Sequence, residues 1–231
     1  MRTLLPGVCL ATAALLGFPA SADTQKRQVS GFSQLELKLP LDVTIRQGKE
    51  FSLVLDVRDS ELVGKIATDV RGDTLVITTN EHSLHMRGKN TATLTMPELR
   101  GVSISGSGDV KVEGFEQGGE VTLAISGSGD ISYRGKSSSL KVAIAGSGNV
   151  ELKGSASNLS VTIEGSGDLK GEGFTAKNAS VTVDGSGDAD LHVAGGTVQL
   201  AVNGSGDIRW SGDASEVSAV THGSGSIQKR R

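Results

Sequence analysis

Residues 121–135 read Val-Thr-Leu-Ala-Ile-Ser-Gly-Ser-Gly-Asp-Ile-Ser-Tyr-Arg-Gly, and this unit, with a Gly-Ser-Gly turn at its centre, decides the fold. Gly-Ser-Gly occurs seven times between Gly106 and Gly225, at spacings of 21, 19, 19, 20, 19 and 19 residues. A fixed period of about 20 residues is typical of solenoids, whose coils bury their apolar sides only by stacking on one another. The sequence therefore predicts a stack of short coils.

Each coil consists of two strands that flank the turn. Apolar residues recur two, four and six residues before the first Gly, as in Ile125, Leu123 and Val121, and the residues between them are polar or small. The alternation resumes after the turn, and a second Gly, such as Gly135, ends most of these segments. A period of two indicates half-buried strands. When coils that wind in the same direction stack, their equivalent strands pair in parallel. The sequence therefore predicts a parallel β-helix with coils of about 19–20 residues, right-handed by the crossover rule.

The aromatic residues Tyr133 and Trp210 both occupy an inward column, because each is the second inward residue after its turn. Exposed aromatic rings commonly stack on sugars, but the position of these two predicts that they fill the core.

The first hundred residues are less regular. Strands are expected over residues 35–39, 41–45, 51–57, 74–79 and 92–96, and residues 61–70 form either a short helix or a bend. An irregular terminal segment would cover the first coil, since a bare solenoid end exposes sheet edges that aggregate.

Residues 1–22 are predicted to be a signal peptide. Arg2 precedes an apolar run over residues 4–20, and Ala20-Ser21-Ala22 has the form of a signal-peptidase site, with cleavage expected before Asp23. The single cysteine lies inside this leader. Export to the periplasm, the cell surface or the medium is expected, and no transmembrane segment is expected in the mature chain.

The charge of the chain excludes one class of partner. The whole chain carries a formal charge of −3, and the leader contains only one charged residue, Arg2, so the mature part is mildly acidic. Charges of both signs are interspersed, which gives no electrostatic footprint for nucleic acid.

The residue after each turn is the candidate for a binding site. Stacking would align six of these residues in a column, which we call the acidic column: Asp109, Asp130, Asn149, Asp168, Asp188 and Asp207. Neighbouring strands lie about 4.8 Å apart, so adjacent carboxylates repel unless something relieves the repulsion. A bound cation such as calcium is one solution. The alternative is that each carboxylate accepts backbone N–H groups within its own turn.

Two other surfaces are candidates for function. Enzymes that cleave acidic polysaccharides need clustered carboxylates near a basic residue, and Asp184, Asp188 and Asp190 with Arg209 could form such a cluster, although periodicity alone would also produce it. The outward residues before the turns are small, and such a flat face could accept a polysaccharide, a protein or a second copy of the chain.

Over residues 30–226 the chain resembles the bacterial head GIN domain family, described as a putative auto-transporter adhesin head. The resemblance rests on the Gly-Ser-Gly-Asp ladder and on four shorter motifs: Gly31-Phe32, Val43-Thr44-Ile45-Arg46-Gln47-Gly48, Gly72-Asp73-Thr74-Leu75-Val76-Ile77 and Met96-Pro97-Glu98-Leu99. It implies an exported β-helical protein with no assigned catalysis.

The resemblance and the repeats together give one GIN-like domain after the leader. It spans residues 23–231, with less regular coils and a cap over 23–100, the repeats over 101–226 and a basic tail over 227–231. We expect a non-catalytic binding or adhesion module of the bacterial envelope, with polysaccharide or another envelope protein as its partner. The alternatives are a polysaccharide-degrading enzyme and a purely structural envelope protein.

Overall fold

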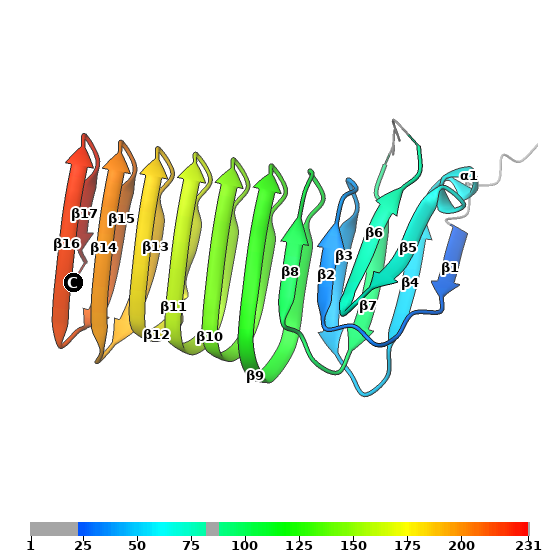
Figure 1. The fold of residues 1–231 in the computed structure, drawn as a ribbon, viewed down its shortest axis with the longest axis horizontal. Helices are drawn as coiled ribbons and strands as arrows, with labels where there is room; N and C mark the ends of the chain where they lie inside the picture. The colour runs from blue at the N-terminus through cyan, green and yellow to red at the C-terminus, as the bar shows by residue number, and fades with distance from the viewer. Residues whose placement is uncertain (1–22, 82–87, 231) are drawn as a thin grey trace, which may run out of the picture.

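The computed structural model describes residues 23–81 and 88–230, which form a 17-stranded sheet wound into a solenoid (Figure 1). The coils stand side by side in one row, ending with β16 (Glu216–Gly223) and β17 (Ser226–Lys229). The predicted signal peptide, residues 1–22, lies outside the described residues. Within those residues, no helix is long and apolar enough to cross a membrane.

Four long strands carry the regular part of the solenoid: β9 (Val110–Gly127), β10 (Ile131–Gly146), β11 (Val150–Gly165) and β12 (Leu169–Gly185). Each runs from one Gly-Ser-Gly corner to the next. β10 pairs in parallel with both β9 and β11, and Ile131 lies opposite Val150, 19 residues later. The solenoid continues through three shorter strands to β16 and β17: β13 (Ala189–Ala194), β14 (Thr197–Gly204) and β15 (Asp207–Asp213). The predicted β-helical solenoid is confirmed.

The inward columns form one continuous core. Val121, Leu123 and Ile125 of β9 are each no more than 2% exposed, and their equivalents in later coils stay buried as far as β14. Tyr133 is 1% exposed and Trp210 is 5% exposed. Both rings therefore belong to the core, as their column predicted.

The corners bring the backbones of neighbouring coils into contact. Gly146 has φ +135°, which L side chains rarely adopt, and a Cβ atom there would overlap the carbonyl group of Gly127. A Cβ atom on Gly148 would overlap the carbonyl group of Gly129 in the same way. The corner is therefore a stack of backbones with no room for side chains.

The first coil of the stack has no Gly-Ser-Gly. It consists of β2 (Gln34–Leu37) and β3 (Asp42–Gln47), which pair in parallel with β8 (Gly101–Ile104) and β9. Leu37 lies opposite Ile104 and Val43 lies opposite Val110, so residues 39–42 stand in register with Gly106-Ser107-Gly108-Asp109. Leu39-Pro40-Leu41 therefore forms the corner, and Asp42 extends the acidic column.

A cap covers the N-terminal end. The parallel stack continues from β2 to β6 (Thr74–Thr79) and from β3 to β7 (Thr91–Met96). Antiparallel strands complete the cap: β4 (Ser52–Val57) lies between β7 and β1 (Asp23–Arg27), and β5 (Ile66–Arg71) pairs with β6. The five strands expected before residue 100 correspond to β2, β3, β4, β6 and β7.

Residues 61–70, which the sequence predicted to form either a short helix or a bend, contain parts of two elements. A single helical turn, α1 (Ser60–Val63), begins after Asp59, whose carboxylate accepts the N–H of Glu61 at 3.0 Å. The strand β5 follows. The sequence reasoning missed both β5 and β1.

Candidate functional site

The acidic column is a ladder of hydrogen bonds between coils. The backbone N–H of Asp130 donates to Oδ1 of Asp109 at 3.0 Å, and the N–H of Asn149 donates to Oδ1 of Asp130 at 2.7 Å. The same bond recurs at 2.9–3.1 Å from Asp168 to Asn149, Asp188 to Asp168, Asp207 to Asp188 and Ser226 to Asp207. Each side chain therefore binds the backbone of the next coil.

This ladder corrects one expectation. The side chains accept backbone N–H groups, as expected, but the N–H group belongs to the next coil and not to the same turn. The N–H dipoles stabilise the carboxylates, and the neutral amide of Asn149 separates Asp130 from Asp168. Arg209 bridges the last pair, with Nη1 at 3.1 Å from Asp188 and Nη2 at 3.0 Å from Asp207. The structure thus relieves the repulsion along the column with its own donors.

Asp207 receives the densest set of donors in the column. The hydroxyl of Ser226 donates to its Oδ1 at 2.8 Å, the N–H of Ser226 donates to the same oxygen, and Arg209 reaches Oδ2. These hydrogen bonds, that from the Ser226 hydroxyl first, lower the pKa of Asp207 below its usual value.

The cluster suggested for polysaccharide cleavage is divided by the fold. Asp188 and Asp190 lie near Arg209 after the corner, whereas Asp184 lies before it and accepts a hydrogen bond from Asn203 at 2.6 Å. Arg230 Nη2 lies 3.0 Å from Asp190 Oδ1, yet this buried oxygen completes no hydrogen bond. Burial raises the pKa of Asp190, and the charge of Arg230 partly opposes the shift.

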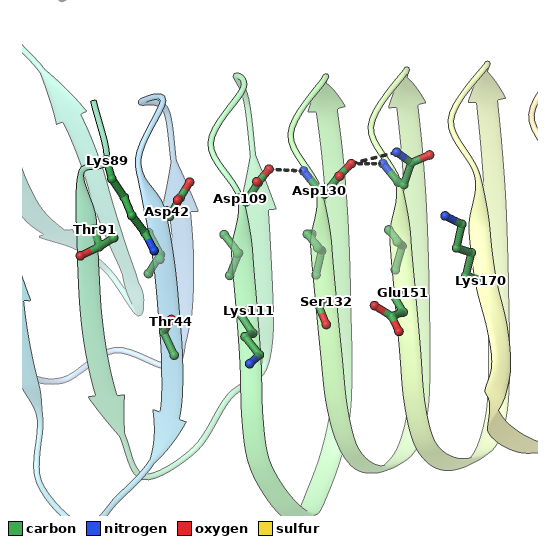
Figure 2. A pocket seen from close by; sticks show the side chains of 15 residues that line it. Asp42, Thr44, Lys89, Thr91, Asp109, Lys111, Asp130, Ser132, Glu151 and Lys170 are labelled. Carbon is green, nitrogen blue, oxygen red and sulfur yellow. Dashed lines mark hydrogen bonds between the residues drawn. The ribbon is translucent and has the colours of Figure 1, made fainter. Parts of the chain in front are cut away.

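A groove of about 530 Å³ lies along the N-terminal half of the column (Figure 2). Asp42, Asp109 and Asp130 form one row after the corners, and a second row below it consists of Thr44, Lys111, Ser132 and Glu151. The groove is lined by Asp42, Val43, Thr44, Lys89, Thr91, Asp109, Val110, Lys111, Asp130, Ile131, Ser132, Asn149, Val150, Glu151 and Lys170. It therefore spans β7, β3, β9, β10, β11 and β12.

Lys89 closes the cap side of the groove. Figure 2 shows its side chain extending from the segment before β7 toward β3. The neighbouring Asn90, only 4% exposed, fixes this segment because its Oδ1 accepts the N–H of Arg58 at 3.1 Å and its carbonyl accepts the N–H of Asp42. A buried amide thus positions the lysine beside the column.

Sequence reasoning missed the cap-side half of this groove, formed by Asp42, Thr44, Lys89 and Thr91. The available signal was the pattern Leu39-Pro40-Leu41-Asp42 between two alternating segments, which keeps the Asp and the flanking alternation of the repeat but has Leu-Pro-Leu in place of Gly-Ser-Gly. In the other half, Asp109, Asp130 and Asn149 belong to the acidic column expected from the sequence, whereas Lys111, Ser132, Glu151 and Lys170 were not among its candidate site residues.

The described residues contain no cluster of three or more His, Cys, Asp or Glu side chains arranged to hold a metal ion. The calcium hypothesis therefore gains no ligand set from this part of the chain. On the flat face before the corners lies a hollow of about 240 Å³ whose lining includes Ser180, Thr182, Gln199 and Ala201.

Comparison with solved structures supports the same architecture. A crystal structure titled a putative adhesin from Bacteroides fragilis NCTC 9343 superposes with a TM-score of 0.83 at 22% identity, covering 91% of this chain and 97% of that one. One from Parabacteroides distasonis ATCC 8503, titled a putative lipid binding protein, gives 0.70 at 20% identity, with coverages of 91% and 97%. A putative adhesin from Parabacteroides merdae ATCC 43184 gives 0.61 at 16% identity, with the same coverages. At these identities the likeness concerns the fold.

No curated protein matches the chain. A family model does match, over residues 31–214, which contain the first coil, most of the cap and all but the last of the Gly-Ser-Gly corners. The chain therefore belongs to the family described as "Putative auto-transporter adhesin, head GIN domain".

Proposed function

We propose that this protein is an exported, non-catalytic binding module of the bacterial envelope, and that it holds an extended polysaccharide in the groove between the cap and the fourth long strand. The observation that carries the proposal is the groove itself, which crosses consecutive coils and presents an Asp or Asn side chain from four of them: Asp42, Asp109, Asp130 and Asn149. Strands repeat about every 4.8 Å, a length comparable to one sugar ring in an extended chain. The family membership and the adhesin titles of its structural relatives support a binding role.

The chemistry of the groove suits a ligand rich in hydroxyl groups. Lys89, Lys111 and Lys170 provide donors, while Asp42 and Glu151 provide acceptors. Sugar hydroxyls both donate and accept, so they can satisfy both rows at once. Tyr133 and Trp210 are buried, so neither ring offers a stacking platform and recognition would use hydrogen bonds and charge.

The hydrogen bonding of the carboxylates favours binding over hydrolysis. A glycoside hydrolase needs one carboxyl group that is protonated near neutral pH and a second that is ionised. In the predicted part of the groove, Asp109 and Asp130 each use one oxygen to accept the backbone of the next coil. An oxygen held in this way serves the stacking of the coils and is not free to contact a substrate.

The test is retention of envelope and extracellular polysaccharides on the immobilised protein, with and without calcium, followed by sizing of each eluted glycan. Retention of intact glycan supports the proposal. Shortened glycan would show a polysaccharide-degrading enzyme, and no retention would leave a structural role or a protein partner. Dependence on calcium would revive the cation hypothesis.

A matched pair of variants locates the site. Lys170→Ala removes a donor from the groove, whereas Lys141→Ala removes an exposed lysine on the strand face before the corner. We expect the first to weaken glycan binding about threefold to tenfold, the loss of one solvent-exposed hydrogen bond worth about 0.7–1.4 kcal/mol. Lys141→Ala should leave binding unchanged, and equal effects of both variants would place the ligand elsewhere.

A further inference from the structure

The C-terminal end of the solenoid is an open sheet edge. β16 pairs with β14 on one side, and within the described residues it has no strand partner on the other. All eight of its residues are exposed, with Val217 at 47% and Val220 at 48%. Because backbone groups alternate along a strand, half of the N–H and C=O groups of β16 point away from β14.

The central residues of β16 carry none of the features that protect exposed strands. Residues 217–221 read Val-Ser-Ala-Val-Thr, without a charge, a proline or a bulge. The opposite end of the solenoid is protected, because β5 carries Asp69 and Arg71, an exposed pair 3.9 Å apart. The two ends therefore differ in kind, and β16 is the one suited to pair with another strand.

The core also continues to this edge. Val217 and Ala219 extend the inward columns of Val198 and Leu200, which are buried one coil earlier. On the β17 side, Lys229 Nζ lies 4.8 Å from the centre of the Trp210 ring and covers the end of the core. On β17, Ile227 is partly buried, whereas the inward residues of β16, Val217 and Ala219, are exposed.

We propose that β16 pairs antiparallel with β16 of a second copy of this chain, joining two solenoids end to end about a twofold axis. In an antiparallel pair, directly opposite residues point to the same side of the sheet. If the twofold axis passes through a residue, each inward residue lies opposite an inward residue of the partner strand. If the axis passed midway between two residues, each inward residue would lie opposite an outward one, which the sheet does not allow.

Among the possible positions of the axis, one through Ala219 pairs oppositely charged or hydrogen-bonding side chains. It places Val217 opposite the partner's Thr221, which extends the core, and Glu216 opposite the partner's His222, both facing outward. Opposite residues have Cβ atoms about 4.5–5.5 Å apart, within reach of a carboxylate–imidazole hydrogen bond. The twofold axis makes this pair twice. A shift of the axis to Val220 would place Glu216 opposite Ser224 and lose both pairs.

The first test is the mass of the purified protein in solution, measured by light scattering over a range of concentrations, together with a charge exchange. Wild type should be a dimer. Glu216→Lys and His222→Glu should each weaken dimerisation about tenfold, because each creates two unfavourable pairs. The double variant restores opposite charges and should return to within about threefold of wild type.

A second test reads the register directly. In Ala219→Cys the two introduced thiols face each other across the axis, where opposite Cα atoms are about 5.5 Å apart, within the range for a disulfide. Mild oxidation should give a covalent dimer. The exposed Ala145→Cys, in β10 far from the edge, should not, and wild type controls for Cys9.

Three results would overturn the proposal. A monomer at every concentration would exclude self-association, and a mass that keeps growing with concentration would indicate head-to-tail pairing. A dimer that survives both charge variants and is not linked through position 219 would use another surface. Circular dichroism of each variant excludes loss of fold as the cause of a monomer. None of these readouts depends on glycan binding.

Discussion

Gly148 lies directly on the carbonyl group of Gly129, one coil earlier, so closely that a Cβ atom on Gly148 would overlap it. The third residue of each Gly-Ser-Gly makes this contact with the corner before it, from Gly129 to Gly225. At the start of the stack, Gly108 lies on the backbone of Leu41. The repeated glycine is therefore required by the spacing of the coils.

Gly148→Ala is expected to destabilise the protein by about 2–4 kcal/mol, because the methyl group meets backbone that cannot move without breaking the adjacent parallel pairing. Gly119→Ala is the matched control, since no atom lies within 4 Å of the Cβ position there. Urea unfolding of both variants measures the difference. A similar small change in both would mean that the coils separate easily.

The acidic column predicts different effects for two substitutions at one position. Asp168→Ala leaves the backbone N–H of Asp188 without its acceptor, at an expected cost of about 1–2 kcal/mol in the free energy of unfolding. Asp168→Asn keeps an oxygen acceptor and should cost less than about 0.5 kcal/mol. Denaturant unfolding at neutral pH compares them. If the two variants are equally destabilised, the charge rather than the hydrogen bond supports the ladder.

The repeated part of this fold could be predicted from the sequence because each buried column recurs once per coil and each corner is marked by glycine. The first coil was not recognised as a repeat, because Leu39 and Leu41 replace the glycines. Both leucine side chains fit because they are buried in the core, with Leu39 2% and Leu41 0% exposed.

The other omissions have a similar physical origin. β1 has the sequence Asp-Thr-Gln-Lys-Arg, without an apolar residue, and becomes a strand by pairing with β4. The groove needs Lys89 from a cap segment beside Asp42 and Asp109 from two different coils. Such a placement follows from the packing of the cap on the solenoid, and no local pattern contains it.

Two neighbouring carboxyl groups are expected to titrate in opposite directions from their usual values. Burial raises the pKa of Asp190, and hydrogen bonds from Ser226 lower the pKa of Asp207. In an NMR titration of the carboxyl carbons, Asp207 should therefore lose its proton at lower pH than Asp190. The reverse order would mean that the ion pair of Asp190 with Arg230 outweighs its burial.

The same shift gives Asp190 a pH-dependent effect on stability. Its folded pKa lies above the unfolded value, so the stability it contributes is fully present below the unfolded pKa and is lost as pH rises through the folded pKa. Asp190→Asn should therefore raise the melting temperature at pH 7, and its advantage should shrink as the pH falls through the acidic range. The exposed Asp213→Asn is the control.

Tyr133 offers a test of the core at a single atom. Its ring is 1% exposed and meets the ring of Phe174 edge-on at 6.4 Å, but its buried hydroxyl completes no hydrogen bond. Desolvation raises the pKa of the Tyr133 hydroxyl, and the nearby Ser137 hydroxyl partly opposes this shift. The Ser137 hydroxyl is also buried without a hydrogen-bond partner.

Tyr133→Phe removes the unpaired hydroxyl and keeps the ring, so it should leave stability unchanged or raise it by up to about 1 kcal/mol. Tyr133→Ala empties the same site and should cost about 3–5 kcal/mol. Thermal and denaturant unfolding of the two variants separate the hydroxyl from the ring. A loss of more than about 1 kcal/mol in Tyr133→Phe would show that the hydroxyl is hydrogen-bonded inside the solenoid, with Ser137 as the nearest candidate partner.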